Sequence, residues 1–361
     1  MTIGRRGFVK GVGAAAVSAA ILSRAGGGAA RARADEVPKG PQKGAPKEGD
    51  IKLPAGATMP MRPLGRTGVE VSLLGLGGFH LGIPRDDKEA VRIIHAAMDH
   101  GVTFLDNCWD YNGGKSEERM GLALAEPSRR QKAFLMTKLD GRTRASAEAQ
   151  LTQSLERLRT DHIDLVQVHE VIRMQDPERV FGPGGAIEAL VAAKKAGKLR
   201  FIGFTGHKDP SIHVHMIETA AKHGFTFDTV QMPVNVMDAH FRSFARSVIP
   251  RARERDMGVL GMKPLGSGII LQSRAVEAPE CLRYSMSQPV SVQITGCDTM
   301  GVLEQALAVA LGFKPMPAAE QEKLLARTAS PAADGRYERF KTSSMFDGTA
   351  KNPKWLESAV L

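Results

Sequence analysis

The stretch Ala133–Glu170, AFLMTKLDGRTRASAEAQLTQSLERLRTDHIDLVQVHE, decides the fold class. It contains two short, mostly apolar runs, Ala133–Lys138 and Ile163–His169, which predict strands buried on both faces. Between them, Ala147–Arg159 has the three-to-four-residue spacing of a helix with one apolar face. A buried strand, a helix and a second buried strand predict a parallel βαβ unit.

The same alternation recurs about every thirty residues on both sides of this unit. Eight units of this size fit a closed (β/α)8 TIM barrel, an α/β fold, better than an open sheet. Two doubly wound domains are the alternative, which is weakened because no Gly-x-Gly-x-x-Gly follows the first strand. We expect strands at Val71–Leu76, Thr103–Asn107, Ala133–Lys138, Ile163–His169, Leu199–Thr205, Thr229–Val234, Gly258–Lys263 and Val290–Thr295. We expect helices at Glu89–His100, Ser116–Ala125, Ala147–Arg159, Ala186–Ala196, Ile212–His223, Phe244–Asp256, Cys281–Ser287 and Val302–Leu311.

Two segments flank the expected barrel. Met61–Leu64 and Val69–Val71 surround a Gly-Arg-Thr-Gly turn and predict an N-terminal β-hairpin. After Gly312 the chain continues as a C-terminal tail with one short helical run, Ala319–Leu325. The sequence leaves open whether this tail covers the barrel mouth or packs against its side.

Ionisable side chains end three successive strands. The second strand ends at Asp106, the third at Lys138 and the fourth at His169. Because the carboxyl ends of parallel barrel strands meet at one face, where the chemistry of such barrels lies, these groups should converge. Tyr111 follows Asp106 in the next loop, and a phenol beside an ammonium should have a lowered pKa and serve as a general acid. If Tyr111 protonates a carbonyl oxygen of a substrate, His169 would donate a hydrogen bond to the same oxygen.

The spacing of these residues and several other motifs resembles the aldo/keto reductases, from about Met61 to Leu311. The motifs are Asp106-x4-Tyr111, Ser116-Glu117-x-x-Met120-Gly121, Thr137-Lys138, Asp164-Leu165-Val166-x-x-His169, Gly203-Phe204-Thr205, Gln231 and Pro264-Leu265-Gly266-Ser267-Gly268. The resemblance implies an NAD(P)-dependent enzyme that reduces an aldehyde or ketone by hydride transfer. Asp106, Tyr111, Lys138 and His169 would be catalytic, and no metal would be needed.

The resemblance also assigns binding residues. NADP(H) or NAD(H) would contact Gly78, Thr205, Gly206, Gln231, Met262, Lys263, Pro264, Leu265, Gly266, Gly268, Gly296 and Asp298, and the substrate pocket would contain His80 and Trp109. Three positions depart from the family pattern: Gly206 replaces the usual Asn, Met262 an aromatic residue and Lys263 a small hydroxyl residue. Just after the last strand, the run 296–300 contains Asp298 and no basic residue, and an acid near a ribose favours the 2′-hydroxyl of NAD over the 2′-phosphate of NADP.

The first residues predict export. Arg5-Arg6-Gly7-Phe8-Val9-Lys10 resembles a twin-arginine motif, a weakly apolar stretch follows, and Ala32-Arg33-Ala34 fits a cleavage site. We expect a signal peptide at 1–34 read by the Tat export machinery, a flexible Pro/Lys/Gly linker at 35–59, the barrel at 60–312 and an extension packed on the barrel at 313–361. The protein would be periplasmic or otherwise extracytoplasmic, without a stable membrane span.

Composition excludes other classes. The net charge of +10 falls to +4 without the six basic residues of 1–34, which leaves 43 basic against 39 acidic residues and no footprint of a nucleic-acid binder. Three cysteines without a CxxC pair give little support for a zinc or iron–sulfur site. A Cys281–Cys297 bridge stays open, but buried free thiols are the preferred interpretation.

Some residues receive a modest interpretation. We expect His213 and His215 to be surface histidines on different faces of a helix. Glu170 should turn away from the substrate and support the site by hydrogen bonds, and Trp109 either walls the pocket or packs under its loop. Two further functions stay open: a nucleotide-binding redox-sensing module, and a sugar epimerase or lyase with tightly bound nicotinamide.

Overall fold

The strands close into a parallel barrel. The computed structural model describes residues 44–361, in which the strands neighbour one another in the order β10-β3-β4-β5-β6-β7-β8-β9 and the ring is closed. This confirms the predicted eight-stranded fold. The barrel strands are β3 (Leu74–Gly77), β4 (Phe104–Leu105), β5 (Phe134–Leu139), β6 (Ile163–Val168), β7 (Leu199–Thr205), β8 (Thr229–Pro233), β9 (Gly258–Met262) and β10 (Val292–Gly296).

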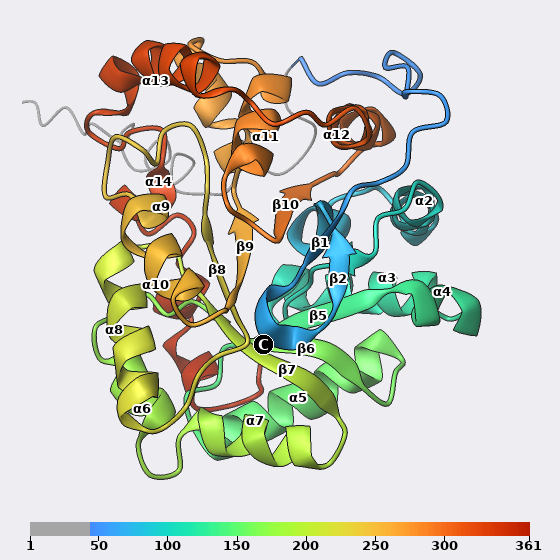
Figure 1. Cartoon of the computed structure of the whole chain (residues 1–361). Helices are drawn as coiled ribbons and strands as arrows, with labels where there is room; N and C mark the ends of the chain where they lie inside the picture. The colour runs from blue at the N-terminus through green and yellow to red at the C-terminus, as the bar shows by residue number, and fades with distance from the viewer. Residues whose placement is uncertain (1–43) are drawn as a thin grey trace, which may run out of the picture. The chain divides into compact units, whose positions relative to one another are not determined.

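Helices surround the strands (Figure 1). They are α2 (Asp87–Asp99), α3 (Lys115–Ala123), α4 (Pro127–Lys132), α5 (Arg144–Leu158), α6 (Asp176–Phe181), α7 (Ala186–Lys195), α8 (Pro210–Lys222), α9 (Phe244–Ser247), α10 (Ile249–Arg253), α11 (Ala278–Ser287) and α12 (Met300–Leu311). The helix expected at Phe244–Asp256 is divided into α9 and α10, and Pro250, which has no N–H to donate, lies in the first turn of α10.

Two apolar layers hold the barrel together. The inner layer consists of side chains such as Phe104, Met136, Leu165 and Leu260, which are less than 1% exposed. The outer layer joins the opposite strand faces to the helices, so the strands are apolar on both sides, as their sequence predicted.

The predicted hairpin closes the amino end of the barrel. Strands β1 (Met61–Pro63) and β2 (Glu70–Ser72) pair antiparallel, and Leu64 and Val71 join the inner layer. The N–H of Arg66 donates to the carbonyl of Asp256, just before β9, over 2.7 Å. The opposite, carboxyl end of the barrel is therefore the end at which a site can form.

The segment before the hairpin corrects one expectation. Its described part, 44–59, lacks helices and strands, but Glu48 pairs with Arg92 over 2.7 Å and the N–H of Gly49 donates to Glu304 over 2.7 Å. Leu53 packs against the outer apolar layer. These residues lie against α2 and α12 and are not the free linker that composition suggested. The expected signal peptide, 1–34, and the remainder of the linker up to residue 43 lie outside the described residues.

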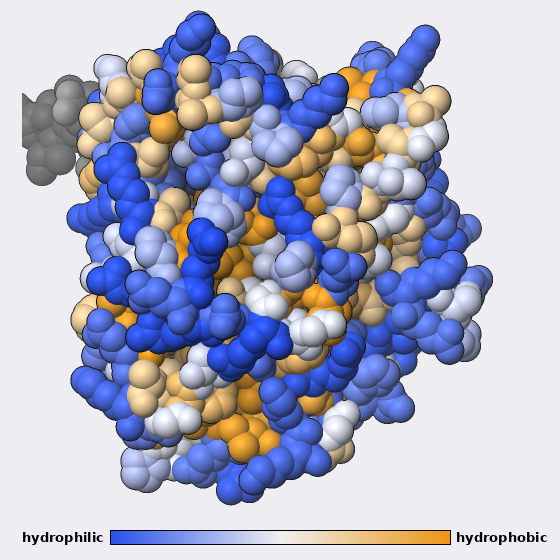
Figure 2. Space-filling model, viewed as in Figure 1, coloured by the Kyte–Doolittle hydropathy of each residue, from blue (hydrophilic) through white to orange (hydrophobic). Residues whose placement is uncertain are grey.

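The face of the molecule shown in Figure 2 is mostly hydrophilic, with hydrophobic patches between polar side chains. Large apolar side chains with substantial exposure in residues 44–361 are Met61, Met174, Val360 and Leu361. Within the same residues, no helix has the length and apolar character that crossing a bilayer requires.

Candidate active site

The four residues expected to be catalytic lie at the carboxyl end of the barrel. Asp106 follows β4, Lys138 lies near the end of β5, and His169 directly follows β6. Tyr111 begins η3 (Tyr111–Gly114), a short turn in which Asn112 and the two glycines after it have positive φ angles and are not helical. The sequence therefore predicted correctly that they converge.

Lys138 is the centre of this group. Its side chain is 1% exposed, and its ammonium pairs closely with Asp106 and donates to the carbonyl of Asn107 over 2.7 Å. A longer contact of 3.4 Å joins Lys138 Nζ to the Tyr111 hydroxyl, and the ammonium lies 4.7 Å from the centre of the phenol ring. A buried ammonium is tolerated here because each of its donors has a partner.

Tyr111 differs from the expectation in one respect. Its ring packs edge-on against Phe79 and His169, with ring centres 5.5 Å and 5.8 Å apart respectively. Burial, followed by the negative charge of Asp106, raises the pKa of Tyr111 well above its usual value. The predicted lowering of the pKa by Lys138 was wrong for this arrangement, because burial and the negative charge of Asp106 raise the pKa of the phenol. The phenol therefore keeps its proton at neutral pH.

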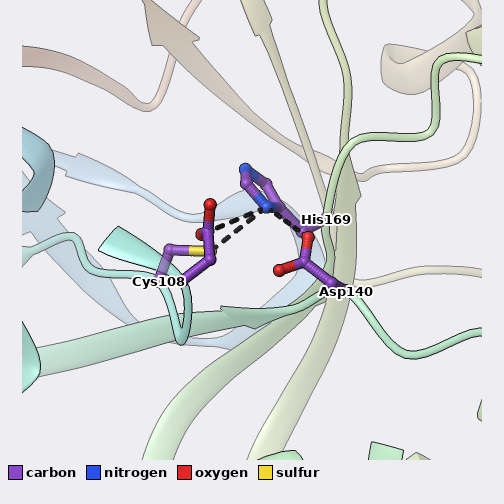
Figure 3. Close-up of side chains that lie close together, drawn as sticks. Cys108, Asp140 and His169 are labelled. Carbon is purple, nitrogen blue, oxygen red and sulfur yellow. Dashed lines mark hydrogen bonds and ion pairs between the residues drawn. The ribbon is translucent and has the colours of Figure 1, made fainter. Parts of the chain in front are cut away.

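His169 is held by one ring nitrogen. Its Nδ1 lies 2.8 Å from Asp140 Oδ1, 3.2 Å from Cys108 Sγ and 3.6 Å from Asp110 Oδ1. Figure 3 shows the other ring nitrogen directed away from Cys108 and Asp140. Burial lowers the pKa of His169, which favours a neutral imidazole.

Sequence reasoning missed Cys108, Asp110 and Asp140. Burial raises the pKa of Asp110 to about 6 and that of Asp140 to about 7, with the neighbouring Asp140 charge also acting on Asp110. Burial also raises the pKa of the Cys108 thiol well above its usual value. The available signal was sequence proximity, because Cys108 and Asp110 share the Tyr111 loop and Asp140 follows Lys138 by two positions.

Two polar atoms without partners mark the other side of the barrel mouth. Thr205 Oγ1, at the end of β7, and Gln231 Oε1, on the paired position of β8, are buried and have no hydrogen-bond partner among the described residues. Gln231 Nε2 contacts the Met262 sulfur over 3.6 Å. Beside them, a Cβ at Gly206 would lie 2.3 Å from the carbonyl oxygen of Val171, so close packing explains why the usual Asn is absent.

Lys263 lies between this pair and the phosphate loop expected from the sequence. Its ammonium faces the rings of Phe346 and Phe340, 4.6 Å and 5.7 Å from their centres, and burial lowers its pKa to about 8. Its φ of +56° is the left-handed conformation.

The loop Pro264–Gly268 has the tight turn that its glycines predicted. Gly266 and Gly268 have positive φ, but their N–H groups donate to the carbonyls of Lys263 and Leu265 within the turn. These two amides therefore donate within the turn, and binding of phosphate by this loop stays a prediction.

Other expected binding residues are packed differently. A Cβ at Gly78 would lie 2.4 Å from the carbonyl oxygen of Asp106, and one at Gly296 would lie 1.9 Å from Nδ1 of His80. His80 therefore covers Gly296, and burial with the Lys263 charge lowers the pKa of His80 to about 4. Asp298 follows β10 and is 8% exposed, and burial raises its pKa.

The C-terminal tail crosses the barrel mouth. It contains α13 (Ala318–Ala332), α14 (Arg339–Thr342) and α15 (Gly348–Lys351), followed by η6 (Pro353–Leu356). Glu170, directly after His169, accepts hydrogen bonds from the N–H groups of Gly348 and Thr349 over 2.8 Å and 2.7 Å, and from the Thr349 hydroxyl over 2.7 Å. Asp347 contacts His207 over 3.0 Å after β7. Of the two placements left open, the tail adopts the one over the mouth.

Near α14 the tail is anchored by a buried ion cluster. Lys341 donates to Asp238 over 2.8 Å and to Glu338 over 2.9 Å, and Asn235 donates to Glu338 over 3.1 Å. Asp238 and Asn235 belong to the loop after β8, so this cluster fixes the tail at a second edge of the mouth.

Two expectations about aromatic residues are settled. Trp109 is fully buried and packs edge-on against Trp355 of the tail, which is the alternative under the loop rather than a pocket wall. His213 is also fully buried, between the rings of Phe204 and Phe244, so the expectation of a surface histidine was wrong.

The three cysteines, Cys108, Cys281 and Cys297, are buried free thiols, which was the preferred interpretation of the sequence.

Comparisons with known proteins agree with this fold. The oxidoreductase YrpG of Bacillus subtilis is 29% identical over 226 residues, which are 57% of this chain and 67% of that protein. The aldo-keto reductase YhdN of the same organism is 30% identical over 218 residues, 56% and 61% of the two chains. L-galactose dehydrogenase of Arabidopsis thaliana is 27% identical over 230 residues, 59% and 67% of the two chains. The match thus spans about two thirds of these relatives or less.

Solved structures extend the agreement. Aldo-keto reductase AKR11C1 of Bacillus halodurans, in a holo form, is 22% identical, and the match covers 74% of this chain and 96% of that one with a TM-score of 0.62. A putative aldo-keto reductase of Pseudomonas aeruginosa, PA4992, is 27% identical over 72% of this chain and 98% of its own, with a TM-score of 0.58. The model of the aldo/keto reductase family matches residues 73–285, more than half of the chain, and the chain therefore belongs to this family of oxidoreductases.

Proposed function

We propose that this enzyme reduces an aldehyde or ketone to an alcohol with Tyr111 as general acid and NADH or NADPH as hydride donor. One observation carries the proposal: a protonated, buried phenol lies 3.4 Å from an ammonium, at the barrel mouth, beside an imidazole with one ring nitrogen directed away from its buried partners. That set of groups suits a carbonyl oxygen, which gains negative charge and then a proton during reduction.

The residues divide the work as follows. Tyr111 holds a proton at its hydroxyl and gives it to the carbonyl oxygen as negative charge develops there. Lys138 then stabilises the phenolate, because its ammonium is 3.4 Å from the oxygen that becomes charged. Asp106 holds Lys138 in place, and His169 orients the carbonyl through Nε2. The nicotinamide, when bound, supplies the hydride.

The residues present fit a nicotinamide. Buried polar atoms normally have partners. Thr205 Oγ1 and Gln231 Oε1 are two of the buried atoms in the described residues that have none, and their residues pair on neighbouring strands, where a carboxamide could bond to both. Met262 offers a thioether surface for the ring, and Lys263 can pair with phosphate as a point charge.

NADH is the proposed preference, because the chain carries Asp298 and no basic residue directly after β10. The dissociation constants of NADH and NADPH, measured by fluorescence titration, check this. NADPH binding about a hundredfold tighter, a difference of about 2.7 kcal/mol, would contradict it.

Export through the twin-arginine route is a separate proposal that rests on Arg5 and Arg6 in their sequence context. Cell fractionation of the full chain and of a variant with both arginines changed to lysine tests it. Retention of the variant in the cytoplasm with export of the parent supports the route, and equal distribution of the two contradicts it.

The test of the main proposal compares Tyr111→Phe with Tyr284→Phe, a buried tyrosine of α11 outside the site. Loss of a general acid should lower kcat for carbonyl reduction by about 10²- to 10⁴-fold and leave nucleotide affinity unchanged, whereas the control should match the parent. Activity of Tyr111→Phe within about threefold of the parent would refute the acid role. Nucleotide binding without any turnover would favour a sensing module, and sugar conversion without net oxidation of nucleotide an epimerase or lyase.

A further inference from the structure

Four side chains with metal-ligating atoms converge behind His169. One atom each from Cys108, Asp110, Asp140 and His169 lies within 4.8 Å of all the others. They come from the loop after β4, the end of β5 and the end of β6, so the barrel brings together positions far apart in the sequence. Figure 3 shows Cys108 and Asp140 on either side of the imidazole nitrogen.

This cluster has more acceptors than protons. His169 and Cys108 can each give one proton, whereas the two carboxylates offer four oxygen atoms. Asp140 Oδ2 and Asp110 Oδ1 are buried with no hydrogen-bond partner in the described part of the chain. Asp140 is 0% exposed, and Figure 3 shows its second oxygen on the side facing Cys108. Buried carboxylate oxygens without partners are costly unless protons or a cation lie between them.

We infer that Cys108, Asp110, Asp140 and His169 Nδ1 bind one Zn²⁺ ion. Tetrahedral zinc with bonds of about 2.0–2.3 Å places its ligand atoms about 3.3–3.6 Å apart. The contacts from His169 Nδ1, 2.8, 3.2 and 3.6 Å, lie within about half an ångström of that range. All ligand atoms lie within 4.8 Å of one another, so the cluster must contract by up to about 1.5 Å between some pairs to surround the ion. This inference departs from the implication of the family resemblance that no metal is needed.

The ligand chemistry favours zinc over Mg²⁺ and Ca²⁺. A thiolate and an imidazole exclude Mg²⁺ and Ca²⁺, which take oxygen ligands, and a four-coordinate set of sulfur, nitrogen and carboxylate oxygen is typical of zinc. On binding, the Cys108 thiol loses its proton to solvent and sulfur bonds to the ion. One thiolate and two carboxylates leave the filled site with one negative charge, which faces the charges of Lys138 and Arg142.

Zinc on Nδ1 has a consequence for the proposed reduction, on which this step rests. Coordination of Nδ1 leaves the imidazole proton on Nε2, the nitrogen directed away from the cluster. Nε2–H can then donate to a carbonyl oxygen. Without an ion, a charged Asp140 favours the tautomer in which Nδ1 carries the proton and donates it in a hydrogen bond to the carboxylate. Nε2 is then unprotonated and can only accept a hydrogen bond.

The experiment measures zinc in the full chain, purified without chelator, by inductively coupled plasma mass spectrometry. The ion is then removed with a chelator and returned by titration against a chromophoric competitor. About one zinc per chain is expected, as for any single structural site. Because loss of even an outer partner of a ligand weakens metal affinity by about 10- to 100-fold, Cys108→Ser and Asp140→Asn should weaken it by more than about 100-fold. Cys281→Ser, another buried thiol, is the matched control and should bind like the parent.

Each outcome decides the assignment. No saturable zinc binding, or equal weakening by Cys281→Ser, overturns it. If Asp140→Asn fails to fold, cobalt substitution of the parent decides: a thiolate-to-cobalt absorption band lost in Cys108→Ser supports the site, and its absence from the parent refutes it. Nucleotide affinity and carbonyl reduction are measured on the same samples. Zinc without reduction would leave the metal site standing and refute the proposed function, and reduction without zinc would do the reverse.

Discussion

Replacement of Glu170 by Gln should release the tail from the barrel mouth without unfolding the barrel. The carboxylate is 3% exposed and accepts three hydrogen bonds, from the Gly348 N–H, the Thr349 N–H and the Thr349 hydroxyl. Hydrogen bonds to a charged group contribute about 1.5–3 kcal/mol each. Glutamine keeps one acceptor oxygen and turns an NH₂ group toward the remaining donors.

We therefore expect a loss of about 2–4 kcal/mol in tail docking, less than the sum of three bonds because their effects are not additive. That corresponds to an increase of about 30- to 700-fold in the opening equilibrium of the tail. The loss should stay local, since the barrel's inner and outer apolar layers do not include Glu170.

Amide hydrogen exchange followed by mass spectrometry measures this opening directly. Peptides covering 345–356 should exchange faster in Glu170→Gln, while peptides from β5 and β6 keep their protection. Glu188→Gln is the matched control, because Glu188 accepts the Gly184 N–H over 2.9 Å at an exposed position. Protection of the tail within about threefold of the parent, a difference of less than about 0.7 kcal/mol, would refute the reasoning. An equal loss of protection throughout the barrel would refute the expectation that the effect of Glu170→Gln is confined to the tail.

Three further outcomes are expected. Lys341→Met leaves Asp238 and Glu338 buried without their cation, so urea denaturation should show a loss of about 3–5 kcal/mol, and a loss below about 1 kcal/mol would contradict the buried pairing. Gly206→Ala forces a Cβ to 2.3 Å from the Val171 carbonyl and should cost about 1–3 kcal/mol by the same measurement, whereas an unchanged midpoint would show that the loop yields freely. The pKa of Lys263 is lowered to about 8 by burial, so the folded state loses this proton before the unfolded state does. The stability of the parent relative to Lys263→Met should therefore rise as pH increases from about 8 toward 10.5, and a fall over that window would contradict the shift.

The barrel could be predicted because its signal is local. Each buried parallel strand is a short apolar run, and in the helix between two strands apolar residues recur every three to four positions. A strand such as Ile163–Val168 can therefore be recognised from the sequence without tertiary information. Asp106, Lys138 and His169 were predictable for the same reason, since strand ends define where the side chains meet.

The predictions that were wrong or missing concern properties set by the tertiary environment of a residue, which the sequence does not show. The pKa of Tyr111 is governed first by burial and then by the negative charge of Asp106, and residue spacing reveals neither. His213 was misplaced because the face that α8 turns toward Phe204 follows from packing. Cys108 and Asp140 meet through the register of neighbouring strands, which no pairwise sequence spacing encodes.

The tail also has a consequence for the order in which the enzyme matures. The barrel strands end at Gly296, whereas the residues that cover the mouth, from Glu338 to Leu356, come later in the chain. During synthesis, the ring can therefore close while its mouth still faces solvent, and a nucleotide can enter before the cover arrives. If a nucleotide binds as proposed, the order of cofactor loading and tail docking determines whether the cover closes over a filled or an empty site.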